Sequence, residues 1–174
     1  DGLAQHSSTR ERLPILDAFY AQIWQRTGQP TSVLDLGCGL NPLAIPWMPL
    51  ATDVEYYAYD VYQDMIDFLN GFMHLARING RAGARDVINA CPDHSVDLAF
   101  VLKAIPCLEQ VDKAAGMRLL ETLNANYLLV SFPVHSLGGQ QKGMATNYEA
   151  RFGELVANKN WSVKRFEFAY ELVF

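Results

Sequence analysis

The sequence contains no long apolar run. No stretch approaches the roughly 20 consecutive apolar residues that a membrane-spanning helix needs. The opening segment, DGLAQHSSTRERLP, is polar and holds no apolar core of the kind that defines a secretory signal peptide. We therefore expect a soluble, cytoplasmic protein that makes no use of a membrane.

Paired cysteines and metal-binding spacings are also absent. The three cysteines, Cys38, Cys91 and Cys107, are odd in number and form no CxxC motif. Neither His74 nor His94 has a companion ligand at a useful spacing. We expect small, buried thiols in a reducing cytosol and no metal site.

An excess of positive charge is missing as well. Lysine and arginine number 14 against 19 aspartates and glutamates, so the net charge is −5. A protein that binds a polyanion by electrostatics alone is expected to be basic. The balance therefore argues against nucleic-acid binding, and any proposal of an RNA partner has to answer it.

The composition itself is typical of a globular domain, with half of the 174 residues hydrophobic and 19% charged. There is no internal repeat or low-complexity segment. We expect one domain over residues 1–174, with a monomer as the default state. It opens with a helical lead-in over residues 1–28, in which apolar side chains recur at three- and four-residue spacing over residues 7–26.

Beyond the lead-in, buried strands alternate with amphipathic helices. Alternation of this kind gives a mostly parallel sheet with helices on both faces. The expected fold class is therefore α/β, a three-layer sandwich with seven strands. A C-terminal antiparallel strand pair distinguishes class I S-adenosylmethionine (SAM)-dependent methyltransferase folds from plain dinucleotide-binding folds. We predict strands at 31–36, 54–60, 82–86, 95–103, 125–133, 161–169 and 170–174, and helices at 41–51, 62–78, 106–124 and 145–158.

The segment VLDLGCGLNP places two glycines directly after the first buried strand. Ligands of open α/β sheets bind beyond the carboxyl ends of the strands, so this turn must let a ligand approach the backbone. Gly37 and Gly39 have no Cβ to block that approach and can adopt positive φ. Asp35, at the strand end, offers a carboxylate to loop amides or, through water, to a ligand's amino group.

Two further acids follow the next strands. Asp60 ends the second strand 21 residues after Gly39, which suits a carboxylate that accepts bonds from ribose hydroxyls. Asp86 follows the third strand, where it can accept from an adenine amine. Pro42 stands where a dinucleotide fingerprint would have its third glycine, which favours SAM over NAD.

Several segments together resemble one family. HSSTRERLP, LDLGCGLNPLAIPWM, FVLKAIPCLEQ, VSFPVHSLGGQQKGM and YELVF look like the aminoglycoside-resistance methyltransferases of the Arm/Rmt type. The resemblance covers nearly the whole chain. It implies SAM-dependent methylation of guanine N7 in the decoding site of 16S rRNA, on the assembled small ribosomal subunit.

The resemblance also implies roles for residues around the cofactor. Arg12 would pair with the SAM carboxylate, because a guanidinium fork suits bidentate contact. Gly37 and Gly39 would pack against the methionine part. Gln110 is an additional candidate, for which a solvated helix position is an equally good interpretation. Apolar walls for the adenine ring would come from Val87 and Leu102.

Three residues would face the target base by the same resemblance: Lys103, Ser136 and Lys142. Guanine N7 carries a free lone pair, so the reaction needs in-line geometry and desolvation rather than an acid/base pair. Many relatives have arginine after the Gly-Gly pair, where this chain has Gln140. That difference is compatible with weaker RNA binding or a divergent target.

Family members carry an additional N-terminal helical segment that helps to dock the ribosome. We expect this chain to begin just after it. That would weaken the argument from the acidic net charge against RNA binding, and it leaves open whether this chain is active. Two other functions remain possible from the sequence. One is a SAM-dependent methyltransferase for another RNA base or a small molecule, and the other is a catalytically silent SAM-binding relative.

Overall fold

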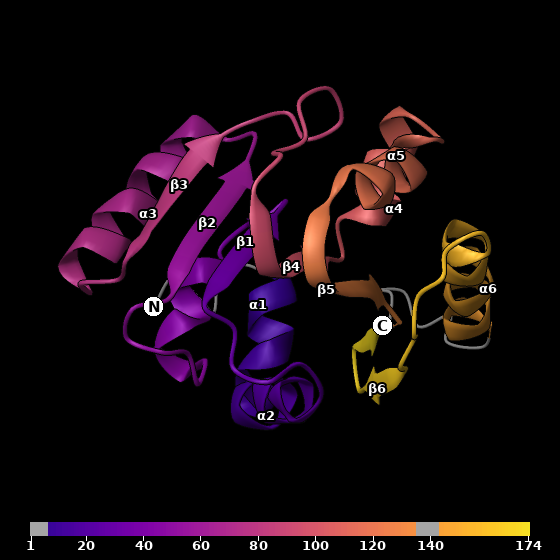
Figure 1. Ribbon diagram of the computed structural model, residues 1–174, viewed down its shortest axis with the longest axis horizontal. Helices are drawn as coiled ribbons and strands as arrows, with labels where there is room; N and C mark the ends of the chain where they lie inside the picture. The colour runs from indigo at the N-terminus through magenta and orange to yellow at the C-terminus, as the bar shows by residue number, and fades with distance from the viewer. Residues whose placement is uncertain (1–6, 135–142) are drawn as a thin grey trace.

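Seven strands form one sheet in the order β3-β2-β1-β4-β5-β7-β6 (Figure 1). The computed structural model describes residues 7–134 and 143–174, and side chains from residue 10 onward. The first five strands run parallel, whereas β7 is antiparallel to both of its neighbours. The strands are β1 Ser32–Leu36, β2 Glu55–Asp60, β3 Gly80–Ala84, β4 Ser95–Leu102, β5 Asn124–Pro133, β6 Phe166–Phe168 and β7 Glu171–Val173.

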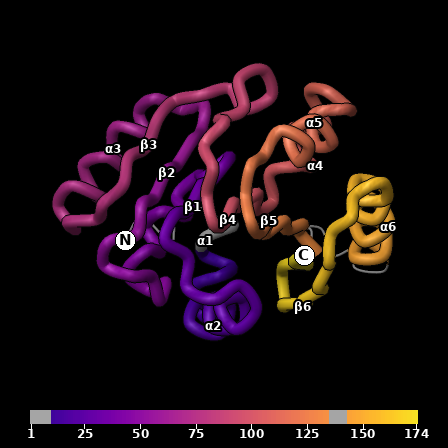
Figure 2. Tube along the Cα trace, in the orientation of Figure 1, coloured from indigo at the N-terminus to yellow at the C-terminus, as the bar shows by residue number. Residues whose placement is uncertain are grey.

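Helices cover both faces of the sheet (Figures 1 and 2). Each face of the sheet has its own hydrophobic core, and alternate residues of β1 contribute to the two. Val33 packs in the first core, with the N-terminal helices, and Leu34 packs in the second core, with the later helices. This division is the expected result of strand geometry, in which successive side chains point to opposite faces. The helical elements are α1 Ser7–Arg12, η2 Leu13–Ile15, α2 Leu16–Thr27, η3 Asn41–Trp47, α3 Gln63–Leu75, α4 Ile105–Val111, α5 Ala115–Thr122 and α6 Met144–Val156.

The predicted fold class is confirmed: the sheet has seven strands, is mostly parallel and ends in an antiparallel pair between two helical layers. Within the part of the chain that the structure describes, no helix is long and apolar enough to cross a membrane.

Several predicted elements differ in detail. The strand predicted at 82–86 lies two residues earlier, at Gly80–Ala84, and the helix predicted at 41–51 is a 3₁₀ helix over Asn41–Trp47. The lead-in is broken by a 3₁₀ turn at Pro14, because proline has no N–H for the helical ladder. The helix predicted at 106–124 is two helices, since Asp112 is extended and its carboxylate accepts the Ala114 N–H before α5. The strand predicted at 161–169 is confined to Phe166–Phe168, because β7 offers only three residues for pairing.

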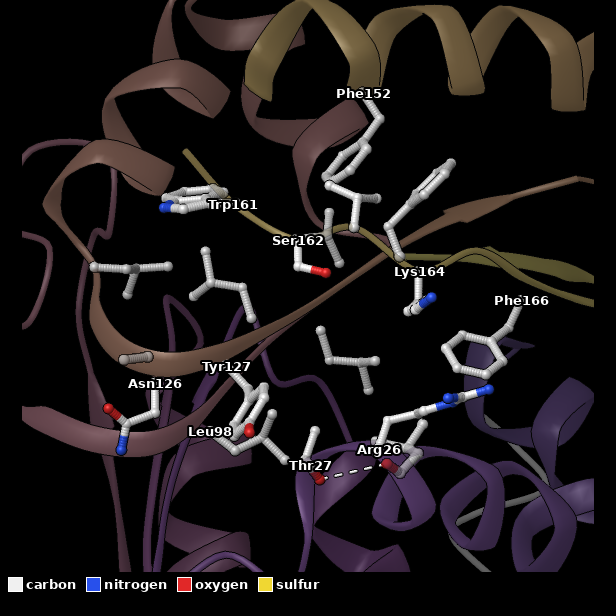
Figure 3. Close-up of a pocket in the computed structure, with 18 of the residues that line it drawn as sticks. Arg26, Thr27, Leu98, Asn126, Tyr127, Phe152, Trp161, Ser162, Lys164 and Phe166 are labelled. Carbon is white, nitrogen blue, oxygen red and sulfur yellow. Dashed lines mark hydrogen bonds between the residues drawn. The ribbon is translucent and has the colours of Figure 1, made fainter. Parts of the chain in front are cut away.

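A groove of about 660 Å³ runs along the amino-terminal half of β5 (Figure 3). β7 pairs with β5 over Ser131–Pro133, so the earlier residues of β5 face this groove instead. Apolar side chains line most of it, together with Arg26, Trp161 and Lys164. None of its lining residues is a predicted site residue.

Phe132 tests the packing of the second core. Its side chain is fully buried and its ring lies 5.0 Å from Tyr148 and 6.3 Å from Phe152, centroid to centroid. We expect Phe132→Ala to lower the free energy of unfolding by about 3–5 kcal/mol, through lost transfer energy and the cavity left behind. Urea denaturation measures this. Tyr127→Ala on the same strand is the control, because Tyr127 is 46% exposed, and an equal loss there would contradict the prediction.

Candidate active site

The turn after β1 has the backbone that its glycines suggest. Gly37 and Gly39 adopt φ of +61° and +50°, a backbone region that residues other than glycine rarely occupy. A Cβ on Gly37 would lie 3.1 Å from the Cβ of Ala104, at the start of the β4–α4 connection. The turn therefore has to be glycine both for its dihedral angles and for its close approach to the neighbouring turn.

Asp60 lies against this turn. Its Oδ2 accepts the Gly39 N–H at 2.9 Å and its Oδ1 accepts the Val61 N–H at 2.7 Å. Each carboxylate oxygen has a further acceptor position, so both can still receive a hydroxyl group. The acid at the end of β2 and the glycine turn thus form one surface.

Asp86 and Val87 follow β3, as predicted. The exposed Asp86 carboxylate accepts bonds from the Asn89 side chain at 2.7 Å and the Ile88 N–H at 2.9 Å. These bonds favour the charged form and lower the pKa of Asp86. Val87 is buried against the second core.

Asp35 is a buried carboxylate that is only half satisfied. Its Oδ2 accepts from the Asn41 amide at 2.8 Å and from the Tyr56 hydroxyl at 2.7 Å. Its Oδ1 is buried and has no partner among the described residues. Burial raises the pKa of Asp35 to about 6, against the opposing effect of the two hydrogen bonds. A buried acceptor without a donor is unfavourable, so this oxygen marks a place where a donor group would be accommodated.

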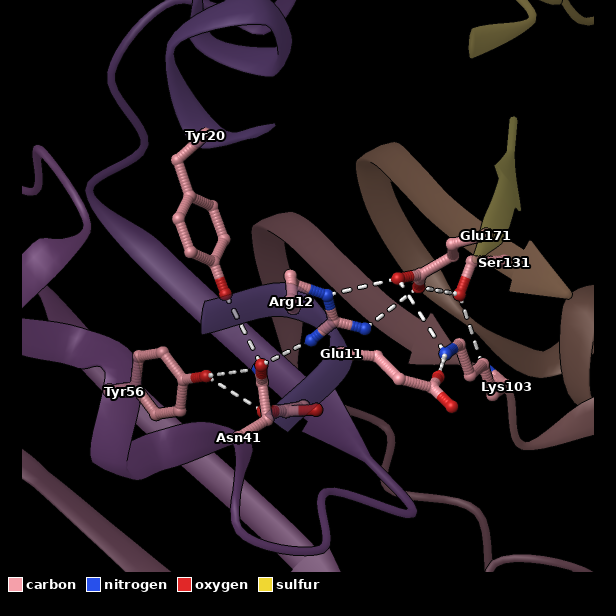
Figure 4. Close-up of polar contacts among 9 residues, drawn as sticks. Glu11, Arg12, Tyr20, Asn41, Tyr56, Lys103, Ser131 and Glu171 are labelled. Carbon is pink, nitrogen blue, oxygen red and sulfur yellow. Dashed lines mark hydrogen bonds and ion pairs between the residues drawn. The ribbon is translucent and has the colours of Figure 1, made fainter. Parts of the chain in front are cut away.

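Arg12 is buried and hydrogen-bonded inside the protein (Figure 4). Its Nε and Nη2 donate to the two carboxylate oxygens of Glu171 at 3.0 and 2.7 Å, and its Nη1 donates to the Asn41 Oδ1 at 2.9 Å. Arg12 and Glu171 are each only 3% exposed. Asn41 therefore links this ion pair to Asp35. Three of the five guanidinium N–H groups are used in these bonds, and two remain for another acceptor.

Lys103 belongs to the same network. Its backbone has φ of +57°, and its ammonium lies 2.7 Å from Glu11 and 4.0 Å from Glu171. The backbone N–H of Lys103 donates to the carbonyl and hydroxyl oxygens of Ser131, and the Ser131 hydroxyl donates to Glu171. The side chain is 9% exposed, so the ammonium points into the protein in this arrangement.

The charges in this network stabilise one another. Burial alone would raise the pKa of Glu171, but the attraction of Arg12 and Lys103 outweighs it and holds that pKa below its usual range. Burial alone would lower the pKa of Arg12, and Glu171 more than compensates. Both groups therefore stay charged despite their burial.

Comparison with known proteins identifies the family. The model of the ribosomal RNA methyltransferase family FmrO matches residues 1–174. The chain is a member of the FmrO family. A 16S rRNA (guanine(1405)-N(7))-methyltransferase of Micromonospora rosea is 35% identical over 172 residues, which are 99% of this chain and 63% of that relative.

Solved structures agree with this membership. The 16S rRNA methyltransferase RmtF, in complex with S-adenosyl-L-homocysteine, is 31% identical with a TM-score of 0.88, over 98% of this chain and 65% of that one. The 16S rRNA methylase ArmA is 30% identical with a TM-score of 0.79, over 99% of this chain and 87% of that one. The resemblance to the Arm/Rmt type and the class I methyltransferase fold are thereby confirmed. The chain spans about three-fifths of the length of its curated FmrO relatives.

The predicted site residues do not all come together. Gly37, Gly39 and Asp60 lie together after β1 and β2. Arg12 is linked through Asn41 to the buried Asp35 near the end of β1. Leu102 ends β4, whereas Gln110 is exposed on α4. Ser136, Lys142 and Gln140 lie outside the described residues. No group of three metal-ligating side chains occurs within residues 10–134 and 143–174.

Sequence reasoning missed the acceptors that hold Arg12. Glu171 was not a candidate, although an acid in the apolar segment YELVF is an unusual residue for a buried strand and could have drawn attention. Asn41 was not a candidate either. Its side chain bridges Asp35 and Arg12, with the Tyr20 hydroxyl as a further donor at 3.2 Å.

Glu171→Gln tests the buried ion pair. Removing one charge leaves Arg12 buried without its counterion, so we expect the free energy of unfolding at pH 7 to fall by about 3–5 kcal/mol. The lowered pKa of Glu171 means that its contribution is present at neutral pH and disappears as pH falls through that pKa. The difference in free energy of unfolding between wild type and Glu171→Gln should therefore become smaller in acid, as measured by urea denaturation at several pH values. Glu167→Gln, in an exposed pair with Arg165, is the matched control and should have little effect.

Proposed function

We propose that this chain transfers a methyl group from SAM to N7 of a guanine in 16S rRNA, within the small ribosomal subunit. The modification would protect the ribosome from aminoglycosides. The proposal is supported by the activities of the FmrO relatives, which are 16S rRNA (guanine(1405)-N(7))-methyltransferases, and by one feature of the site. That feature is the buried Oδ1 of Asp35, which has no partner among the described residues and lies at the end of the strand that leads into the glycine turn.

The residues present fit SAM. Asp35 would accept from its ammonium group, which supplies the missing donor. Gly37 and Gly39 would lie along the methionine part, and the free acceptor positions of Asp60 would receive the ribose hydroxyls. Arg12 would offer its two remaining N–H groups to the carboxylate. Around the adenine we place Asp86, Val87, Leu102 and, as the least supported member, Gln110.

When bound, SAM would supply a methyl group on a positively charged sulfur, and the protein's task would be to position the base. Guanine N7 attacks without losing a proton, so no general base is required. The base must leave its stack to reach the site. Lys103, Ser136 and Lys142 are the proposed target contacts, and the Lys103 ammonium would have to leave Glu11 to reach RNA. We further propose that the chain acts as a monomer in the cytoplasm.

Methyl transfer to ribosomal subunits tests the activity. Tritiated SAM is incubated with purified, unmodified small subunits and, in parallel, with free 16S rRNA, and the modified base is mapped. We expect N7-methylguanine in the decoding site of the assembled subunit, and loss of transfer in Asp60→Asn. A full-length FmrO relative serves as the positive control. If the relative labels the subunits and this chain does not, the proposal is wrong.

The pKa of Asp35 predicts a pH dependence for cofactor binding. The carboxylate is charged above about pH 6 and neutral below it, and a cationic ammonium group prefers the charged form. The affinity for SAM, measured by calorimetry, should therefore fall as pH drops through about 6. Asp35→Asn keeps an oxygen for Asn41 and Tyr56 but removes the free acceptor, so its affinity should be weaker and nearly independent of pH. Asp112 is an exposed acid on another element, so Asp112→Asn should bind SAM with the pH dependence of the wild type. If Asp35→Asn also keeps the wild-type pH dependence, Asp35 is not the group that binds the ammonium of SAM.

A further inference from the structure

Among the described residues, arginines that form no ion pair gather around β3. Six lysines and arginines form ion pairs with acids: Arg12, Lys103, Arg118, Arg151, Lys159 and Arg165. Seven others have no ion pair with an acid among the described residues: Arg10, Arg26, Arg77, Arg81, Arg85, Lys113 and Lys164. Three of the seven, Arg77, Arg81 and Arg85, lie within nine consecutive residues. Within the part of the chain that the structure describes, these three arginines are a local concentration of cations outside ion pairs.

Two of these arginines lie on a stack of aromatic rings. The Arg81 guanidinium is 5.4 Å from the Tyr57 ring centroid, and the Arg85 guanidinium is 4.9 Å from that of Tyr59. The His94 ring stacks on both tyrosines, with centroid distances of 4.8 and 6.0 Å and interplanar angles of 18° and 14°. We call this set, Arg81–Tyr57–His94–Tyr59–Arg85, the β3 ladder.

The β3 ladder is fixed in place by its surroundings. The Tyr59 hydroxyl and the His94 Nε2 are 2.9 Å apart. Gly83, between the two arginines, leaves room for the Tyr59 ring, since a Cβ there would lie 3.0 Å from it. Cation–π contact pre-orients each guanidinium while leaving its N–H groups free for an acceptor. The arginines are therefore held ready to bind an anion.

Arg77 occupies a position that favours glycine. It follows α3 with φ of +55°, and the bonds from the Arg77 N–H to the His74 carbonyl and from the Ile78 N–H to the Met73 carbonyl form a Schellman motif. Glycine is the usual residue at this point, because a Cβ makes the left-handed backbone conformation unfavourable. An exposed arginine kept there at that cost points to a use for its charge.

The β3 ladder adjoins the proposed cofactor site. β3 is an edge strand of the sheet (Figure 1), so its outer side is not covered by another strand. At its carboxyl end, the Arg85 N–H donates to the Asp60 carbonyl oxygen at 2.8 Å. Arg85 is therefore joined directly to the residue that we assign to the ribose, and Asp86 follows it.

We infer that the β3 edge, with Arg77, Arg81 and Arg85, is a docking surface for the phosphate backbone of the rRNA substrate. This inference rests on the proposed function. Guanidinium groups bind phosphate in a bidentate manner, and unpaired arginines on this edge supply the positive charge that the chain as a whole lacks. The edge would contact the RNA beside the target base, with Arg85 nearest to the methyl donor.

Salt-dependent binding to small ribosomal subunits tests the surface. The triple variant Arg77→Gln, Arg81→Gln, Arg85→Gln is compared with wild type over a range of salt concentrations. Three lost phosphate contacts should lower the slope of log K against log salt by about 2 and weaken binding about 10- to 100-fold near 0.1 M salt. Affinity for SAM and the midpoint of thermal unfolding are measured on the same samples. Arg26→Gln, an exposed and unpaired arginine on α2, is the matched control and should keep the wild-type slope.

The outcomes separate this inference from the proposed function. If wild type methylates subunits and the triple variant keeps the wild-type slope, the docking surface is wrong and the activity stands. If wild type neither binds nor methylates subunits, both are wrong. Arg77→Gly gives an independent check. Glycine adopts the left-handed backbone conformation without strain, so thermal stability should stay equal or rise while subunit binding weakens. Stability that falls together with binding would indicate a purely structural role for Arg77.

Discussion

The buried ion pair between Arg12 and Glu171 is the interaction on which the site depends. It joins residues 159 positions apart, one in the first helix and the other in the last strand. Because both charges are almost completely removed from water, each requires the other to remain ionised. Through Asn41 the pair also orients Asp35, and through Ser131 and Lys103 it reaches the ends of β4 and β5. The lead-in helices and the C-terminal hairpin therefore act as parts of the site rather than as additions to a nucleotide-binding sheet.

Charge distribution explains how an acidic chain can belong to a family of RNA-modifying enzymes. Many of its basic residues are neutralised inside ion pairs, as Arg151 is by Glu109 and Glu154. Net charge therefore says little about which cations are available. A short edge strand such as β3, which contains Arg81 and is flanked by Arg77 and Arg85, can present a local positive potential that the sum over all residues conceals.

The sequence allowed the fold to be predicted because its determinants are local. Hydrophobic runs mark β1, β2, β4 and β5, and the glycine turn and Asp60 lie together as their spacing indicated. The weakly apolar β3, with the sequence GRAGA, was predicted two residues too late. The partners of Arg12 could not be predicted in this way, because the pair with Glu171 exists only through the tertiary arrangement of the two ends of the chain. The break at Asp112 escaped prediction for a different reason. The residues on either side are good helix formers, and a single side-chain bond to the Ala114 N–H ends one helix and starts the next.

The position of β7 has a consequence for the order in which the molecule can assemble. This strand comes last in the sequence yet lies between β5 and β6, inside the sheet rather than at its edge. During synthesis, the parallel strands can pair before residue 171 exists, but β6 has no neighbour until then and Arg12 has no counterion. Closing so long a loop is also entropically unfavourable and slow compared with local contacts. A polypeptide interrupted before residue 171 would therefore contain the five parallel strands but neither the partner of β6 nor the counterion of Arg12, so the buried ion pair can form only after β7 has been made.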